Sequence, residues 1–270
     1  MLKKITSLII LFGGLLMAQT TDYAKDKIKN QPKAIEESFT KAIIRANIIE
    51  DYSLEYHIKT TYNKSGYITQ KDSYSENGDL IYSDIYSYDD QNRLVKIETI
   101  NPNQDILFIR DFEYTENGYT ESKSENDVVV LVTSYELDKQ GQIISQKETN
   151  YLDENLVSER INEYKNNVLI KTDVKFKNGG YTVKYKYNAQ NLPTEEIVYD
   201  LNNKLVSKKL RAYDEQQNIV EENLYDNHGK LKTNHRIKYE YDDKGNWTTR
   251  TQYANTIEEP ISNAKRTIRY

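Results

Sequence analysis

The stretch that decides the fold is "YEYDDKGNWTTRTQY", residues 239–253. Asp242 can accept hydrogen bonds from the backbone of the turn that it opens, and Gly245 fills the fourth turn position, where a left-handed backbone costs little without a Cβ. Polar and apolar residues alternate before and after this turn, as they do in strands with two different faces. The stretch therefore predicts two antiparallel strands joined by a tight turn.

The same pattern recurs along the chain. Aromatic or apolar residues that precede a turn lie 23 to 28 residues apart, at Tyr62, Tyr88, Tyr114, Leu137, Tyr164, Tyr187, Tyr213 and Tyr241. Weaker copies lie midway, so the structural unit is about half that period. Asn-Gly pairs at 77–78, 117–118 and 178–179 predict turns of the same kind, and Asn202-Asn203 and Asn218 can replace glycine there.

Residues 51–270 are therefore expected to form an all-β domain, an antiparallel meander of about fifteen strands. The natural twist of so many strands predicts a twisted, curled or spiralling sheet, either an open spiral, a half-pipe or two layers. The segment 19–50 is less regular. Its apolar residues fit a short helix after Pro32, or a strand pair whose alternation has decayed.

Residues 1–18 have the features of a secretory signal peptide, with Lys3 and Lys4 before a short apolar run that ends at Ala18. Export to the periplasm or the extracellular space is expected, with no transmembrane segment in the mature chain. Without those two lysines, 35 basic and 42 acidic side chains remain, and a net charge of −7 disfavours nucleic acid as a partner. There is no cysteine, so stability must come from packing and strand pairing.

The units "YSYDDQNRL", "RAYDEQQNI" and "YEYDDKGNW", together with the closing "AKRTIRY", resemble the YD repeats of RHS-type and teneurin-type proteins, and small exported YD-repeat proteins of Bacteroidetes-type bacteria. The resemblance covers most of 51–270 and is weakest in 112–183. It implies spiralling β-sheets that enclose or present something else and are not catalytic, with carbohydrate binding attributed to some members. The shell-forming members are far longer, so encapsulation of a toxin by this chain alone is not expected.

Catalytic chemistry is not expected, because no convergent acid, base and nucleophile pattern is present. His228 and His235 with Asp226 match no spacing of a closed metal site, and His57 is remote in sequence. The acid pairs Asp89-Asp90 and Asp242-Asp243 are better explained as turn formers than as glycosidase or calcium carboxylates. The sequence therefore predicts no catalytic residue, no metal and no cofactor.

The tyrosine rows are the one feature that suggests a binding surface. Tyr239, Tyr241, Trp247 and Tyr253 are the candidate ligand face, although such rings are better explained as the cross-strand ladder of the fold. The expected function is a non-catalytic scaffold or binding module that contacts a protein or a cell-envelope glycan through one sheet face. The alternatives are an accessory or immunity partner of an RHS-like toxin system, and an outer-membrane barrel, which charged residues on both strand faces disfavour.

Overall fold

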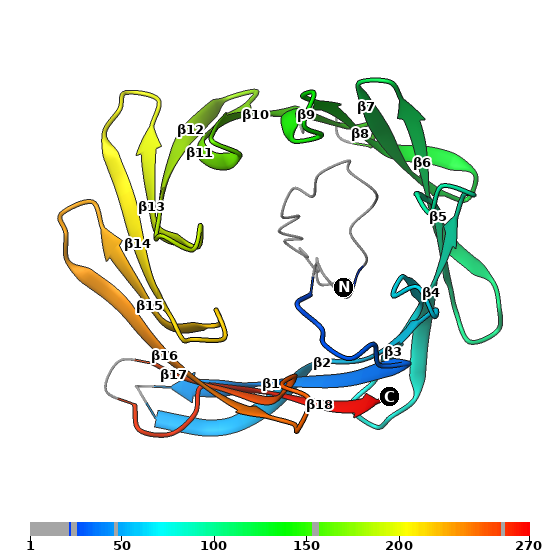
Figure 1. Ribbon diagram of the computed structural model, residues 1–270, viewed down its shortest axis with the longest axis horizontal. Coiled ribbons are helices and arrows are strands. Elements are labelled where there is room, and N and C mark those ends of the chain that lie inside the picture. Colours follow the sequence, from blue (N-terminus) through cyan, green and yellow to red (C-terminus); the bar gives the residue numbers. More distant parts are fainter. Residues whose placement is uncertain (1–21, 23–25, 46–47, 153–156, 255–256) are drawn as a thin grey trace.

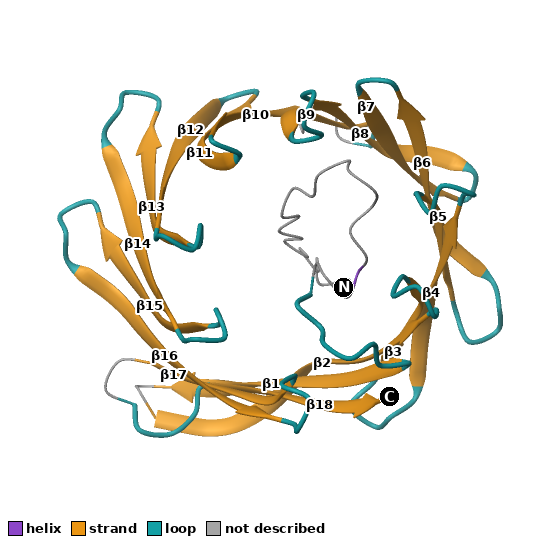
Figure 2. Cartoon of the chain, viewed as in Figure 1, coloured by secondary structure: helices purple, strands orange, loops and turns teal. Residues whose placement is uncertain are grey.

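The computed structural model describes residues 22, 26–45, 48–152, 157–254 and 257–270, and these contain eighteen strands (Figures 1 and 2). The strands are β1 (Ala34–Arg45), β2 (Ile48–Tyr62), β3 (Ile68–Tyr74), β4 (Leu80–Tyr88), β5 (Leu94–Ile100), β6 (Ile106–Thr115), β7 (Gly118–Glu125), β8 (Val128–Leu137), β9 (Ile143–Asn150), β10 (Val157–Lys165), β11 (Val168–Phe176), β12 (Gly179–Tyr187), β13 (Pro193–Asp200), β14 (Leu205–Tyr213), β15 (Ile219–Asp226), β16 (Leu231–Tyr241), β17 (Trp247–Ala254) and β18 (Ser262–Arg269). The signal-peptide prediction for 1–18 lies outside the described residues.

The strands form one closed antiparallel barrel in which each strand pairs with the next, as the ring in Figure 1 shows. The first and last strands complete the ring, because β1 pairs with β18 from Ala34 opposite Arg269 to Lys41 opposite Ser262. The prediction of an antiparallel meander is confirmed, but the prediction of an open sheet of about fifteen strands is wrong. Closure satisfies the backbone groups of both edge strands, which a curled open sheet would leave without partners.

The strand count was too low for two physical reasons. The segment left open between helix and strand contributes β1, which is held on both sides by β2 and β18. The turn between β7 and β8 was also missed, because it has no aspartate–glycine signature. It is a two-residue turn that places Asn126 and Asp127 at positive φ (50 and 62), which is the geometry of the tightest hairpin turns.

The turn at 242–246 has the predicted chemistry. One carboxylate oxygen of Asp242 accepts the backbone N–H groups of Lys244 at 3.0 Å and Asn246 at 2.8 Å, and Gly245 has φ 78. Three details of the prediction are wrong. Gly179 is the first residue of strand β12 and has no left-handed backbone. Gln217 rather than Asn218 takes the left-handed position (φ 65). Gly118 lies in strand β7, where a Cβ would come within 1.9 Å of the Tyr135 carbonyl oxygen, so close approach rather than a turn requires glycine.

The wall of the barrel is one sheet thick and partly accessible on both sides. Every residue of β13 and of β15 is half-buried, whereas a strand with one face on a dry core would alternate between buried and exposed. A ring of eighteen strands is too wide for side chains from opposite walls to meet. The apolar packing is therefore local, as in the small cluster of Ile35, Tyr62 and Ile68. In the described part of the chain, no helical segment has the length and apolar character needed to cross a membrane.

Candidate ligand-binding inner face

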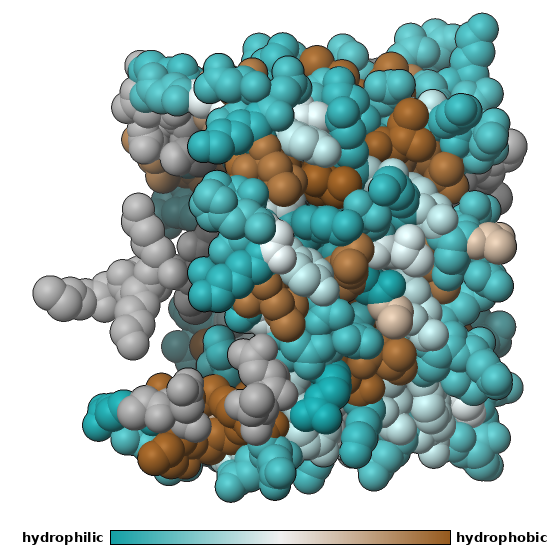
Figure 3. Space-filling view, turned by 90° about the vertical axis from the view of Figure 1, so that its left-hand side faces the viewer, coloured by the Kyte–Doolittle hydropathy of each residue, from teal (hydrophilic) through white to brown (hydrophobic). Residues whose placement is uncertain are grey.

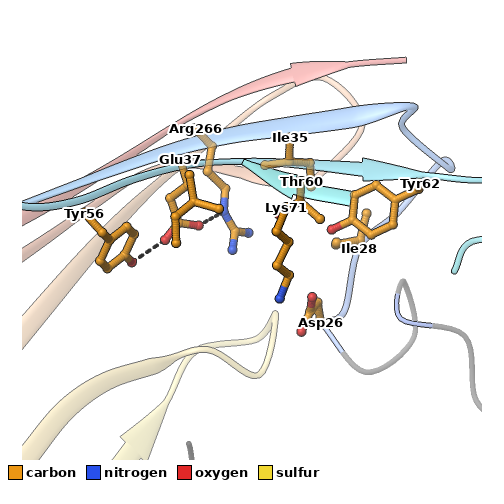
Figure 4. Close-up of a pocket in the computed structure, with 10 residues that line it drawn as sticks. Asp26, Ile28, Ile35, Glu37, Tyr56, Thr60, Tyr62, Lys71 and Arg266 are labelled. Carbon is orange, nitrogen blue, oxygen red and sulfur yellow. Dashed lines mark hydrogen bonds and ion pairs between the residues drawn. The ribbon is translucent and has the colours of Figure 1, made fainter. Parts of the chain in front are cut away.

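The N-terminal segment marks which side of the wall is the inside. Residues 26–33 lie within the ring (Figure 1), and Asp26 and Ile28 share a cavity of about 200 Å³ with Glu37, Tyr56 and other wall residues (Figures 1 and 4). Strand alternation and the pairing register then extend this assignment around the ring. The inner-face residues used below are Phe39, Lys71, Tyr88, Arg110, Tyr114, Glu121, Tyr164, Tyr187, Tyr213, Glu222, Tyr239, Tyr241, Trp247, Arg250 and Arg266.

The outer face carries charges in the middle of its strands. Lys96 contacts Glu98 at 2.8 Å, and Lys171 contacts Asp173 at 2.7 Å. On the neighbouring strands β13 and β14, the Lys208 ammonium lies 3.3 Å from the Glu195 carboxylate. Hydrophobic residues on the side shown in Figure 3 are interrupted by hydrophilic ones. The outer face therefore has charged side chains between its apolar ones.

Inner-face tyrosines near one end of the barrel bind strand to strand. Six hydroxyls donate to the backbone carbonyl of the residue at or next to the start of the preceding strand. The bonds are Tyr88 to Ile68 (2.8 Å), Tyr114 to Leu94 (3.0 Å), Tyr164 to Ile143 (3.1 Å), Tyr187 to Leu169 (2.5 Å), Tyr213 to Pro193 (2.7 Å) and Tyr239 to Ile219 (3.2 Å). We call these six hydrogen bonds the tyrosine latches. They explain the period of the sequence, because each repeat contributes one tyrosine whose hydroxyl binds the backbone of the preceding strand. Burial raises the pKa of Tyr187 to about 12, which keeps its hydroxyl a donor at neutral pH.

The four residues of the candidate ligand face do not share a face. Tyr239, Tyr241 and Trp247 cluster on the inner face, with the Tyr239 ring centroid 6.2 Å from Tyr241 and 6.3 Å from Trp247. Tyr253 lies on the outer face beside Lys238, whose ammonium is 5.3 Å from the ring centroid. The bulge between Glu240 and Tyr241 breaks the alternation that placed Trp247 and Tyr253 together.

A charged and aromatic group lies next to this cluster, on the first and last strands. The Arg266 guanidinium is 3.5 Å from the Trp247 ring centroid and donates to the Glu37 carboxylate at 2.5 Å. The Tyr56 hydroxyl donates to the same carboxylate at 2.6 Å (Figure 4). Burial and the neighbouring Glu37 charge raise the pKa of Tyr56. This group could not be predicted from the sequence, because only the β1–β18 register brings residues 37 and 266 together.

The Lys71 ammonium points into the cavity toward Asp26 in Figure 4. Arg250 adds a second cation between the rings of Phe39 and Trp247, at 5.8 and 5.9 Å from their centroids. Rings with guanidinium and carboxylate groups at their edges can stack on a ligand and hydrogen-bond its polar substituents.

The opening stretch also holds the N-terminal segment. The Asn246 side chain accepts from the Lys29 backbone N–H at 2.7 Å and donates to the Lys29 carbonyl at 2.8 Å, as a neighbouring strand would. The Tyr270 hydroxyl donates to Asp242 in the same turn. Residues 27–30 therefore cover part of the inner face beside Trp247, where a second cavity of about 60 Å³ remains.

The remaining sequence candidates lie apart from this group. His57 is on the outer face, 2.7 Å from the Glu36 carboxylate, His228 is exposed in a turn, and His235 is on the inner face opposite Glu222. Among the described residues, no group of three or more His, Cys, Asp or Glu side chains could hold a metal ion. The Asp89 carboxylate accepts the backbone N–H groups of Gln91 and Arg93, which makes it a turn former.

Comparison with known proteins extends the description of the fold. No model of a protein family matches the sequence, and no curated protein matches it. Among solved structures, the chain is similar to a porin-like protein from Bacteroides uniformis, with a TM-score of 0.51 and 10% identity over 89% of this chain and 97% of that one. A porin-like protein from Bacteroides vulgatus gives a TM-score of 0.41 at 10% identity, over 87% of this chain and 97% of that one.

TcdB2–TccC3 without its hypervariable C-terminal region gives a TM-score of 0.30 at 11% identity, over 82% of this chain but only 16% of that one. At such identities, the likeness to the Bacteroides uniformis protein concerns the fold alone. The other two likenesses are too distant in shape to carry an argument. The similarity of the repeats to YD repeats remains a resemblance, since no family match accompanies it.

Proposed function

We propose that the chain is a non-catalytic, exported binding module, a hollow barrel with water on both sides of its wall that binds a glycan of the cell envelope on its inner face. The observation that carries the proposal is the contrast between the two faces. The outer face has charged pairs in mid-strand, such as Lys171 with Asp173, and the inner face gathers rings around Trp247 and Arg266.

The inner-face group has the chemistry that sugars require. A pyranose ring presents C–H groups that stack on an aromatic face, and hydroxyls that hydrogen-bond to charged side chains. The rings of Tyr239 and Trp247 provide aromatic faces for stacking. Arg250, Arg266 and Lys71 provide charged groups for hydrogen bonds to the hydroxyls. An extended peptide is the next candidate, because Asn246 already binds backbone in the way that a strand does.

A location in the cell envelope is part of the proposal. The signal-peptide pattern of residues 1–18 supports export, and the fold shared with a porin-like protein of Bacteroides uniformis is consistent with that location. Activity as an enzyme is not proposed, since no catalytic arrangement supports one. Turnover of any envelope glycan by the purified protein would count against the non-catalytic part.

An outer-membrane barrel is the second candidate, and the shared fold favours it. The outer face argues against it, because each lysine at the bilayer midplane costs about 2–4 kcal/mol. Lys96, Lys171 and Lys208 lie in mid-strand on that face. The protein should therefore stay monodisperse in detergent-free buffer, and precipitation that only detergent reverses would favour the membrane barrel.

A partner role in an RHS-like toxin system has only the resemblance of the repeats behind it. Co-purification of a toxin domain with the chain would support that role over glycan binding.

The fluorescence of Trp247, the only tryptophan in the chain, tests the proposed function. Soluble envelope oligosaccharides should change its emission in a saturable way. A control protein with Trp247→Phe and Tyr253→Trp moves the reporter to the outer face and should give no change. Two results would refute glycan binding on the inner face. One is a saturable change in the emission of the tryptophan at position 253 with none at Trp247. The other is the absence of binding, by calorimetry, to any oligosaccharide tried.

A further inference from the structure

Exposed apolar side chains gather at one end of the barrel. Among the described residues, seventeen large hydrophobic side chains are exposed, by 36% to 72%. Fifteen of them lie at or within a few residues of the turns that follow odd-numbered strands: Ile43, Ile44, Ile48, Ile81, Ile106, Leu107, Val128, Val129, Tyr151, Leu152, Val157, Phe176, Leu201, Val206 and Leu231. In an antiparallel barrel these turns all lie at the same end, which we call the apolar rim.

The opposite end, with the tyrosine latches, has no such side chain among its described residues. Side chains of this size, about half exposed, give the apolar rim on the order of 1,200 Å² of apolar surface, whereas the largest patch of a typical monomer is about 300–600 Å². A stable protein–protein interface buries about 800 Å² on each partner. The rim is therefore large enough to be an interface.

The charges on the apolar rim are divided between opposite sides of the ring. The β3–β4, β5–β6 and β7–β8 turns carry the acids Glu76, Asp79, Asp105 and Asp127 and no basic residue, while Glu125 at the end of β7 is paired with Lys123. The β11–β12, β13–β14 and β15–β16 turns, across the ring in Figure 1, carry Lys177, Lys204 and Lys230, and the adjoining strands add Lys175 and Lys232. Asp200 and Asp226 are the acids there, and their carboxylates accept backbone N–H groups of their own turns.

We infer that the apolar rim binds the apolar rim of a second copy of this chain. A two-fold axis in the plane of the rim, passing between β9 and β10, places the acidic side of one barrel over the basic side of the other. This symmetry sets Asp105 opposite Lys204, and Asp79 opposite Lys230, twice in each dimer. The result is a longer tube with the two latch ends outermost, whichever ligand the inner face binds.

A lipid surface is a poorer occupant of the rim. Apart from Tyr151, Leu152 and Leu201, the apolar residues flank the turns in the adjoining strands. The turns themselves carry Glu76, Asp79, Asp105 and Asp127, all exposed. Insertion would carry these acids into the headgroups first, and anionic lipids would repel them. Facing the lysines of a second copy, the same acids are favourable.

Two complementary variants test the symmetry. Asp79→Lys with Asp105→Lys places lysines opposite Lys230 and Lys204 of the second copy, and Lys204→Glu with Lys230→Glu places glutamates opposite Asp105 and Asp79. By sedimentation velocity, the natural chain should form dimers, and each variant alone should show a dimer Kd raised at least about tenfold. Mixed in equal amounts, the two variants should recover a dimer, because each rim now faces its opposite.

A matched control changes charge at the latch end, with Lys139→Glu and Glu215→Lys, both exposed turn residues, and should dimerise like the natural chain. Far-UV circular dichroism and melting temperature establish that every variant folds. A monomer at all concentrations, or a dimer that neither rim variant weakens, would overturn the inference. Binding of the monomer to phosphatidylglycerol vesicles would instead assign the rim to a lipid surface.

Discussion

The tyrosine latches predict a specific loss of stability when their hydroxyls are removed. Tyr187, Tyr213 and Tyr239 each donate to a backbone carbonyl of the neighbouring strand, at 2.5, 2.7 and 3.2 Å. Phenylalanine keeps the ring in place and removes the hydrogen bond. The triple Tyr→Phe variant therefore isolates the contribution of the hydroxyls from that of the rings.

Each half-buried hydrogen bond contributes about 1 kcal/mol to the free energy of unfolding. The three latches lie on alternate strands and share no partner, so their losses should add to about 3 kcal/mol. For a chain of this length, 1 kcal/mol shifts the melting temperature by about 2–4 °C. The triple variant should accordingly melt about 6–12 °C below the natural chain.

The matched control removes three outer-face hydroxyls, at Tyr199, Tyr225 and Tyr253, which make no hydrogen bond within the described part of the chain. Its melting temperature should stay within about 2 °C of the natural chain. Thermal unfolding of both variants by circular dichroism gives the comparison. Equal melting temperatures for the two triple variants would refute the latch account, because ring packing alone would then explain the tyrosine period.

Three further predictions concern single positions. Gly118→Ala should lower stability well beyond Gly179→Ala in chemical denaturation, because a Cβ at 118 meets the Tyr135 carbonyl oxygen at 1.9 Å while that at 179 meets nothing within 4 Å; equal midpoints would contradict this. Backbone N–H donors lower the pKa of Asp226 from 3.8. The ionised Asp226 carboxylate therefore stabilises the folded protein above pH 3.8, and this stabilisation is lost as the pH falls through the lowered pKa. Asp226→Ala should therefore be less stable than the natural chain at pH 7 but not at pH 2, and Asp226→Asn should remove the pH dependence while keeping the turn; a pH-independent Ala effect would refute the assignment. Burial raises the pKa of Glu121 above 4.5, opposed by Arg110, so ionisation destabilises the fold as pH rises from 4.5 through the raised value. Glu121→Gln should be more stable than the natural chain at pH 8 and not at pH 4, and lower stability at pH 8 would show that the Arg110 charge outweighs burial.

The hairpins could be predicted from sequence because their cause is local. Asp242 and Gly245 set the turn within four residues, and the alternation around them sets the strand faces. Closure could not be predicted in this way. It depends on β1 pairing with β18, more than 200 residues away, and no local feature of residues 34–45 or 262–269 announces the partner.

The candidate site illustrates the same division. Tyr239, Tyr241 and Trp247 were selected from local alternation and do lie together, whereas Tyr253 was assigned to their face because a bulge is invisible in the sequence. Arg266 and Glu37 were missed altogether. Their contact is a consequence of closure, so a single sequence without its register offers no signal for it.

The closing pair of strands is the most direct test of the central claim, that the meander forms a closed barrel. Ser38 and Lys265 are register partners across β1 and β18 on the outer face, and the natural chain has no cysteine to interfere. The Cα atoms of directly opposed residues in antiparallel strands lie about 4.5–5.5 Å apart, within the Cα–Cα range that a disulfide spans.

The double variant Ser38→Cys with Lys265→Cys should therefore form an intramolecular disulfide under mild oxidation, visible as faster migration on a non-reducing gel. Ser38→Cys with Ser145→Cys, a residue on β9 across the ring, should stay reduced. The predicted result is a rapid and complete crosslink between positions 38 and 265, and none between positions 38 and 145. Failure of the first pair to crosslink in a folded protein would contradict closure and return the chain to an open, spiralling sheet.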